Sequence, residues 1–290
     1  MSQPPTLEMH EEPPADGLGV MDAVRMGWAL LRGDFWPVWV LGLVVYAIQA
    51  GCGIFGAIPY IGGCISLVLA IFVQAPLTAG LFFAIRRRID GAPAQVNDVF
   101  EGFRQRYWQS VVAMLPQIIV ATVWVIVTGG IVLVLLLGQG VFTHDLSHQE
   151  ILVAVLTSVA VAVPLLIAMG LVMLLFLFSF LAVWDHPESG WSAVKDSVRV
   201  VRGHYLATLG LALLFGLISF AAMLVGLIAC CVGIFFTMPA VMVWYSATMI
   251  YLYRAWTGRP LVQPVSEGGA APGVEPLLPA PGEPPAGPQG

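Results

Sequence analysis

The chain has 290 residues, of which 59% are apolar and only 10% are charged, whereas about a quarter are charged in ordinary soluble domains. This composition excludes a soluble globular protein and a disordered one, and a net charge of −5 provides no basic surface for a nucleic acid. The remaining class is a multi-pass membrane protein, in which helices satisfy the backbone hydrogen bonds. We therefore expect an all-α bundle of membrane-spanning helices.

The two ends of the chain differ in composition from the part between them. Residues 1–20 are acidic and contain prolines, so we expect a disordered tail. They lack the basic and short apolar stretches of a cleavable signal peptide. Residues 257–290 are rich in proline and glycine, so we expect a disordered cytoplasmic tail, with a Pro-x-x-Pro ligand as the alternative. The helical part covers residues 21–256, in three repeat units over residues 21–90, 96–185 and 191–256.

The first unit opens with an amphipathic segment, Met21–Asp34. Val24, Trp28 and Leu31 form an apolar stripe at helical spacing, with basic residues beside it. A short helix of this kind lies in the membrane interface. The alternative interpretation is an ordinary cytoplasmic extension of the span that follows.

A gap in the charge distribution predicts the first hairpin. Asp34 is the only charged residue between Arg32 and Arg86, and one crossing needs about 20 apolar residues. We therefore expect two spans, Pro37–Ala57 and Gly62–Ile85, joined by a tight turn. Because a hairpin returns the chain to the side it left, the basic residues that flank it lie on one face of the membrane.

Three glutamines lie deep in the predicted spans. Gln49, Gln74 and Gln117 are each roughly 14–18 Å from the charged end of their span at 1.5 Å per residue, near the bilayer midplane. One interpretation is that they hydrogen-bond helices together, with Gln49 bonded to Gln74 across the first hairpin. The other is a small polar pocket that recognises a lipid headgroup or a neutral solute.

The cysteines lie toward the outer ends of spans. Cys52 and Cys64 belong to the first hairpin, and Cys230 and Cys231 to the last. The outer face of a bacterial membrane is oxidising, so a Cys52–Cys64 bridge is one interpretation. Buried free thiols are the other.

The middle unit opens with a segment of similar pattern, Asn97–Tyr107. Two apolar stretches follow, Gln109–Leu137 and Ile151–Trp184, and both are longer than one crossing requires. Gly129-Gly130 could interrupt the first stretch and Pro164 the second. Two spans in the second stretch would place every later basic residue outside, against the positive-inside rule. We therefore expect one long, tilted or kinked helix in each.

The loop between these two helices contains a short histidine motif. His144 and His148 would share one face of a helical turn, and Asp145 or Glu150 would supply an oxygen ligand. This spacing is compatible with zinc. His-x-x-x-His alone is a weak signal, so a solvated loop is the alternative, and we expect no metal or cofactor.

The last unit repeats features of the first. The segment Ser192–Tyr205 resembles Met21–Asp34, and at an offset of 170 four residues, among them Arg32/Arg202 and Gly33/Gly203, are identical. Two spans follow, Ala207–Ala229 and Val232–Tyr253. We interpret the architecture as three units, each an interfacial helix followed by a transmembrane hairpin.

This arrangement places all twelve basic residues on one face of the membrane. The positive-inside rule then orients the six spans with both termini in the cytoplasm, in an inner membrane of bacterial type. The basic residues of the amphipathic segments would contact anionic headgroups. The candidate contacts are Arg25, Arg32, Lys195, Arg199 and Arg202.

Several short motifs resemble a known group of membrane proteins. They are Trp184-Asp185, Ala193, Asp196-Ser197 and Arg202-Gly203-His204-Tyr205, together with Gly27-Trp28, Ala75-Pro76-Leu77, Gly80 and Phe100-Glu101-Gly102-Phe103. On the basis of these motifs, the chain resembles uncharacterised bacterial six-span membrane protein families over roughly residues 20–256. The group includes the membrane domain attached to some glycerophosphoryl diester phosphodiesterases. The resemblance implies a shared helical fold, but not phosphodiesterase activity, because this sequence lacks the acidic metal-binding motifs of the catalytic domain.

The predicted spans carry no ionisable residue at their centres, although such residues usually mark proton relays and ion-coupled transport. The sequence also contains no G-x-S-x-G, H-E-x-x-H or nucleotide-binding glycine motif. We therefore expect a non-enzymatic membrane scaffold or accessory factor that contacts membrane lipids and no nucleic acid. The alternative is a transporter or facilitator for a lipid or small neutral solute. The sequence names no protein partner.

Overall fold

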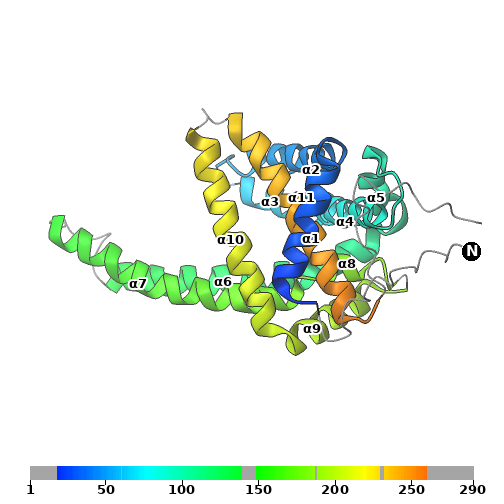
Figure 1. The fold of residues 1–290 in the computed structure, drawn as a ribbon. Helices are drawn as coiled ribbons and strands as arrows, with labels where there is room; N and C mark the ends of the chain where they lie inside the picture. Colours follow the sequence, from blue (N-terminus) through cyan, green and yellow to red (C-terminus); the bar gives the residue numbers. More distant parts are fainter. Residues whose placement is uncertain (1–17, 60, 139–147, 187, 229–231, 260–290) are drawn as a thin grey trace, which may run out of the picture.

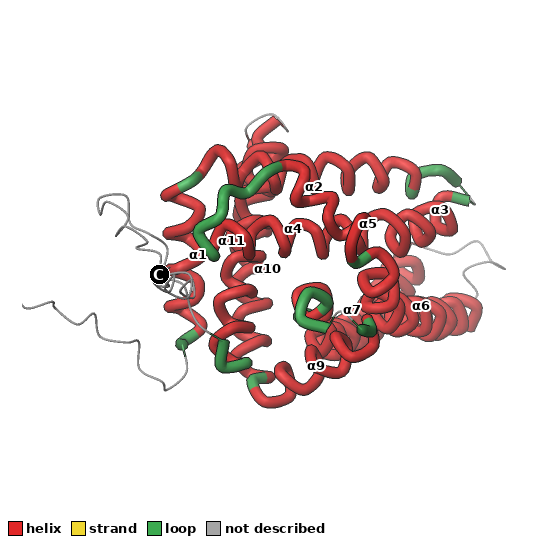
Figure 2. The backbone as a smooth tube through the Cα atoms, turned by 90° about the vertical axis from the view of Figure 1, so that its right-hand side faces the viewer, coloured by secondary structure: helices red, strands yellow, loops and turns green. Residues whose placement is uncertain are grey.

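The computed structural model describes residues 18–59, 61–138, 148–186, 188–228 and 232–259. These residues form helices and the turns between them, with no strand in any of these ranges (Figures 1 and 2). Six helices are long and apolar enough to cross a membrane, which confirms the expected all-α fold with six candidate spans. They are Phe35–Phe55, Gly62–Ile89, Tyr107–Gly138, Leu152–Ala182, Tyr205–Ile228 and Gly233–Trp256.

The first unit contains a helix before its hairpin and a π-helical turn within it. Its elements are α1 (Val20–Gly33), α2 (Phe35–Phe55), α3 (Gly62–Leu69), the π turn η1 (Ala70–Gln74) and α4 (Ala75–Ile89). The π turn ends two residues before Pro76, which has no N–H to donate to the carbonyl four residues earlier. A wider turn lets the helix continue past this missing hydrogen bond.

The middle unit contains two long helical spans, the second of which is interrupted. Its elements are the 3₁₀ turn η2 (Val96–Phe100), α5 (Glu101–Gln105), α6 (Tyr107–Gly138), α7 (His148–Met173), the 3₁₀ turn η3 (Leu174–Phe176) and α8 (Ser179–Ala182). Helix α6 continues through its Gly-Gly pair, as expected. The second stretch forms one candidate span, Leu152–Ala182, as expected for a single long helix. Its α-helical hydrogen bonding is interrupted after Met173, away from Pro164, where the sequence suggested a break.

The last unit begins with a helix that matches α1 in length. Its elements are α9 (Gly190–Gly203), α10 (Tyr205–Ile228) and α11 (Val232–Trp256). Helices α1 and α9 both have 14 residues and both end at a glycine. The residue after each has similar backbone angles, φ −127° and ψ 51° at Asp34 and φ −132° and ψ 36° at His204. The segment before α6 differs, because it is divided between η2 and α5.

Helix α11 lies at the centre of the core. Each residue from Ser246 to Arg254 is buried, and α1, α2, α4 and α10 all pack against this helix. Two of these contacts require glycine. A Cβ atom on Gly42 would lie 2.7 Å from the carbonyl oxygen of Pro239, and one on Gly27 would lie 2.6 Å from the Thr248 hydroxyl.

The apolar sides of α1 and α9 are covered by protein. In α1 the buried residues include Val24, Leu30 and Leu31, and the Trp28 ring packs at a tilt against that of Trp244 in α11, with 4.9 Å between the ring centroids. Helix α9 packs in the same way against α6, α8 and η3. Neighbouring helices thus bury most of the two predicted stripes, including Val24, Leu31 and Val201, whereas Trp28 keeps 44% of its surface exposed. The basic residues beside them remain exposed.

The α6–α7 hairpin projects away from this core. Figure 1 shows it running sideways, across the direction of α10, and the two helices contact mainly each other over their outer parts. None of the most apolar window of α6 is buried. Figure 2, a quarter turn away, shows α2 and α4 also running across α10. The three hairpins therefore leave a common base in different directions.

Candidate functional site

The common base is held together by ion pairs between residues far apart in the sequence. We call this set the charged base, and its members come from the linkers and helix ends of all three units. They are Asp34, Arg86, Arg87, Arg88, Asp90, Asp98, Asp185, Arg254 and Arg259.

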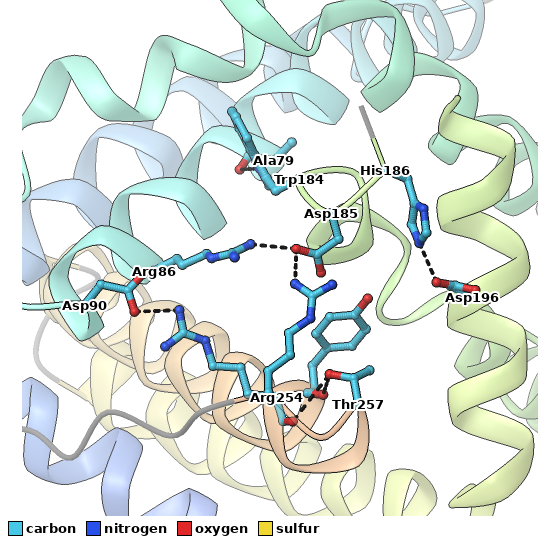
Figure 3. A network of polar contacts seen from close by, with 11 residues as sticks. Ala79, Arg86, Asp90, Trp184, Asp185, His186, Asp196, Arg254 and Thr257 are labelled. Atoms are coloured by element: carbon cyan, nitrogen blue, oxygen red, sulfur yellow. Dashed lines mark hydrogen bonds and ion pairs between the residues drawn. The ribbon is translucent and has the colours of Figure 1, made fainter. Parts of the chain in front are cut away.

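Asp185 is the centre of the charged base (Figure 3). Its Oδ1 atom accepts a hydrogen bond from Arg86 Nη1 at 2.9 Å and also pairs with Arg259. Its side chain is only 2% exposed, and Oδ2 is buried without a hydrogen-bond partner in the described ranges. The two guanidinium groups therefore compensate a carboxylate that is almost removed from water.

The other pairs connect the end of α4 to the remaining units. Arg87 pairs with Asp98 at 2.7 Å, and the second oxygen of Asp98 accepts the backbone N–H of Gln95 at 2.8 Å. Arg254, near the end of α11, pairs with Asp90 at 2.7 Å (Figure 3). Arg88 pairs with Asp34 in the α1–α2 linker. The three arginines at the end of α4, Arg86, Arg87 and Arg88, thus contact acidic residues of three other segments.

The segment after α8 is fixed by an aromatic side chain as well as by charge. Trp184 Nε1 donates to the carbonyl of Ala79 in α4 at 2.8 Å, and its ring stacks on Phe83 at 4.4 Å. Two residues later, His186 Nε2 lies against Asp196 of α9 (Figure 3). Asp196 also pairs with Arg199 at 3.0 Å.

The interruption between α7 and α8 is satisfied by side chains of other helices. Ser197 of α9 donates to the carbonyl of Leu175 at 2.8 Å and accepts the N–H of Phe178 at 3.1 Å. Tyr205 at the start of α10 donates to the carbonyl of Leu171 at 3.0 Å. Backbone groups released at a helix break in an apolar environment need such partners.

The predicted midplane glutamines have different roles. Gln117 donates from Nε2 to the carbonyl of Phe176 at 3.1 Å, another group of the interruption. Gln74 lies at the end of the π turn. The hydrogen bond expected between Gln49 and Gln74 is not formed in the described structure, where each is part-exposed on its own helix. The contact of Gln117 supports the interpretation that it joins helices.

The five predicted lipid contacts all have exposed side chains. Arg25 and Arg199 lie near aspartates of their own helices, at 3.7 Å from Asp22 and 3.0 Å from Asp196. The other three make no ion pair with any residue that the structure describes. They are Arg32, Lys195 and Arg202.

The remaining sequence hypotheses fall partly outside the described residues. His144, Asp145, Cys230 and Cys231 are not described, so neither the zinc motif nor the last cysteine pair is placed. Cys52 is a buried free thiol and Cys64 is an exposed one. Among the described side chains, no group of three His, Cys, Asp or Glu residues could hold a metal ion.

Sequence reasoning missed the charged base, although one signal was present. It treated the basic clusters only as indicators of membrane orientation. The signal was the presence of four aspartates, Asp34, Asp90, Asp98 and Asp185, in the same linkers and helix ends as the arginines. Which aspartate meets which arginine depends on contacts between residues up to 164 positions apart.

No protein-family model, curated protein or solved structure matches this chain. The candidate site is therefore interpreted from its chemistry. Its arginines and aspartates neutralise one another between segments, an arrangement that stabilises the meeting of the three hairpins.

Proposed function

We propose that this chain is a multi-pass inner-membrane protein that acts as a scaffold or accessory factor and catalyses no reaction. The observation that carries the proposal is the charged base. Arg86, Arg254 and Arg259 are all paired with aspartates of other segments, so their charges hold the hairpins together. A rigid base with projecting apolar hairpins can position a second membrane protein within the bilayer.

The α6–α7 hairpin is the surface on which we place such a partner. Side chains such as Ile126, Val134 and Leu156 are exposed along both of its helices. The core of this protein leaves the hairpin uncovered over its outer part. In a membrane this surface is available to lipid and to the helices of other proteins, since association there depends on packing rather than on exclusion of water.

The proposal includes the three-unit organisation and the orientation. The equal lengths of α1 and α9 and the similar backbone at Asp34 and His204 support a duplicated first and last unit. Both termini lie in the cytoplasm, where the exposed basic residues contact anionic headgroups. The resemblance to bacterial six-span families agrees with this arrangement and rests on the quoted motifs.

Transport of a lipid or small neutral solute is the alternative function. Transport predicts that the purified protein moves a solute or a lipid across a membrane. The test compares vesicles that contain the protein with protein-free vesicles. One assay measures swelling driven by glycerol entry, and the other measures movement of a fluorescent phosphatidylcholine between leaflets. The scaffold proposal expects equal rates. A rate that rises with the amount of protein would overturn it in favour of transport.

A second measurement tests the scaffold directly. A photoreactive amino acid at Ile126 of α6 should give discrete protein adducts in cells, whereas the same residue at Leu206, exposed on α10, serves as the control position. Lipid adducts alone at Ile126, or the same protein adducts at both positions, would contradict a specific partner on the hairpin.

A further inference from the structure

An open cavity of about 360 Å³ lies where α2, α10 and α11 meet. Ligand sites in proteins begin at about this size and are mostly apolar with a few polar groups. The wall fits that description, with apolar side chains and three hydroxyl groups. The apolar part consists of Ala212, Phe215, Gly216, Met238, Val241 and Met242, and the hydroxyls belong to Tyr46, Ser219 and Tyr245.

These three hydroxyls have no hydrogen-bond partner in the described structure. Two other hydroxyls of α11 are satisfied within that helix, although that of Tyr251 is buried without a partner in the described structure. Ser246 donates to the carbonyl of Met242 at 2.8 Å, and Thr237 donates to that of Gly233 at 3.0 Å. A hydroxyl in an apolar environment is costly without a partner. Three such groups around one cavity therefore indicate a ligand with hydrogen-bonding oxygens.

The position of the cavity along the helices limits the ligand. Tyr46 is eleven residues from the end of α2 at the charged base, and Tyr245 is eleven residues from the corresponding end of α11. Each distance is about 16 Å along its own helix axis. For a bilayer whose normal follows α10 and α11, the Tyr245 distance corresponds to about half of a hydrocarbon core of roughly 30 Å. No charged residue lines the wall, so the ligand's polar group at this depth is neutral.

We propose that this cavity binds a neutral lipid of the diacylglycerol class. Its ester carbonyl oxygens accept hydrogen bonds from the hydroxyls of Tyr46, Ser219 and Tyr245. Its chains pack on Phe215 and on the adaptable side chain of Met242. A phospholipid is a poorer ligand because its charged headgroup stays at the membrane surface. The inference depends on the chain lying in a membrane and not on the scaffold role.

Photolabelling of the full chain in phosphatidylcholine vesicles tests the site. A diacylglycerol with a diazirine in one chain should label peptides covering residues 212–219 or 238–245, and unlabelled diacylglycerol should compete. Gly216→Phe places a ring in the cavity and should reduce this labelling by about tenfold, which corresponds to about 1.4 kcal/mol. Gly210→Phe is the matched control, since both glycines face open space on α10 and Gly210 is not part of the wall.

A variant without the three hydroxyls separates recognition from simple filling of the cavity. In Tyr46→Phe/Ser219→Ala/Tyr245→Phe, the diacylglycerol probe should lose its advantage over a diazirine alkane, because only the hydrogen bonds are removed. The proposal is overturned if a diazirine phosphatidylcholine labels the same peptides as efficiently as diacylglycerol. It is equally overturned if Gly216→Phe leaves labelling unchanged, or if the triple variant keeps the full preference.

Discussion

Asp185 illustrates how single side chains stabilise this protein. Its carboxylate is 2% exposed, whereas the side chains of Arg86 and Arg259 remain 31% and 36% exposed. The aspartate therefore loses nearly all of its hydration on folding, while its partners keep part of theirs. An ion pair with one buried member depends strongly on geometry, because removal of either charge leaves the other poorly compensated.

We expect Asp185→Asn to lower the stability of the folded chain by about 2–3 kcal/mol. This is less than the loss for a fully buried pair, because the two freed guanidinium groups are part-hydrated. The measurement is thermal unfolding of the purified protein in detergent. Asp22→Asn is the matched control, since the Asp22–Arg25 pair is exposed and such pairs contribute about 0.2–1 kcal/mol. Equal melting temperatures for the two variants would contradict the central role of Asp185.

At the scale of elements, the interruption between α7 and α8 is the most distinctive feature. An uninterrupted helix would satisfy its own carbonyls, whereas this one requires side chains from α6, α9 and α10. The donors are Gln117, Ser197 and Tyr205. The interruption therefore connects the middle hairpin to the last unit, and it gives Gln117 a structural role.

Gln117→Leu should destabilise the protein by about 1–2 kcal/mol, because the carbonyl of Phe176 loses its donor in an apolar environment. Gln49→Leu provides the comparison: the residue type is the same and the depth is similar, but its side chain makes no hydrogen bond in the described ranges. Melting temperatures of both variants in the same detergent measure the difference. If Gln49→Leu is the more harmful change, the assignment of Gln117 to the interruption is wrong.

For the whole molecule, two groups of basic residues have different roles. Those of the charged base hold helices together. Arg32, Lys195 and Arg202 are exposed and make no ion pair within the described parts of the chain. An unpaired cation at a membrane surface attracts anionic lipid by about 1 kcal/mol, so the second group is available for lipid binding.

Replacing Arg32, Lys195 and Arg202 together with glutamine should reduce the phosphatidylglycerol that remains bound after purification. The amount can be measured by mass spectrometry of the extracted lipid, and added salt should reduce it further because these contacts are screened. The matched variant replaces three arginines that already have a carboxylate one turn away on the same helix, Arg25, Arg104 and Arg199. The contact proposal fails if the first variant retains as much phosphatidylglycerol as the unchanged protein, and the matched variant measures how far a neighbouring carboxylate weakens each contact.

The sequence by itself determined the number and approximate limits of the membrane helices and the concentration of charge at their ends. These are local properties, because a stretch of about 20 apolar residues spans a bilayer whatever its neighbours are. The motifs Trp184-Asp185 and Asp196-Ser197 can also be recognised in the sequence. The contacts that they make cannot, since hydropathy indicates how deep a residue lies and not which helix it faces.

Only the tertiary structure decided the pairs of the charged base, the interruption after Met173 and the cavity between α2, α10 and α11. Each depends on the rotation and crossing of helices that are far apart in the chain. Nearly every side chain of an apolar span is equally compatible with the hydrocarbon core, so composition does not determine how the helices are rotated or where they cross. Close contacts such as that of Gly42 with Pro239 and ion pairs such as Arg254–Asp90 fix it.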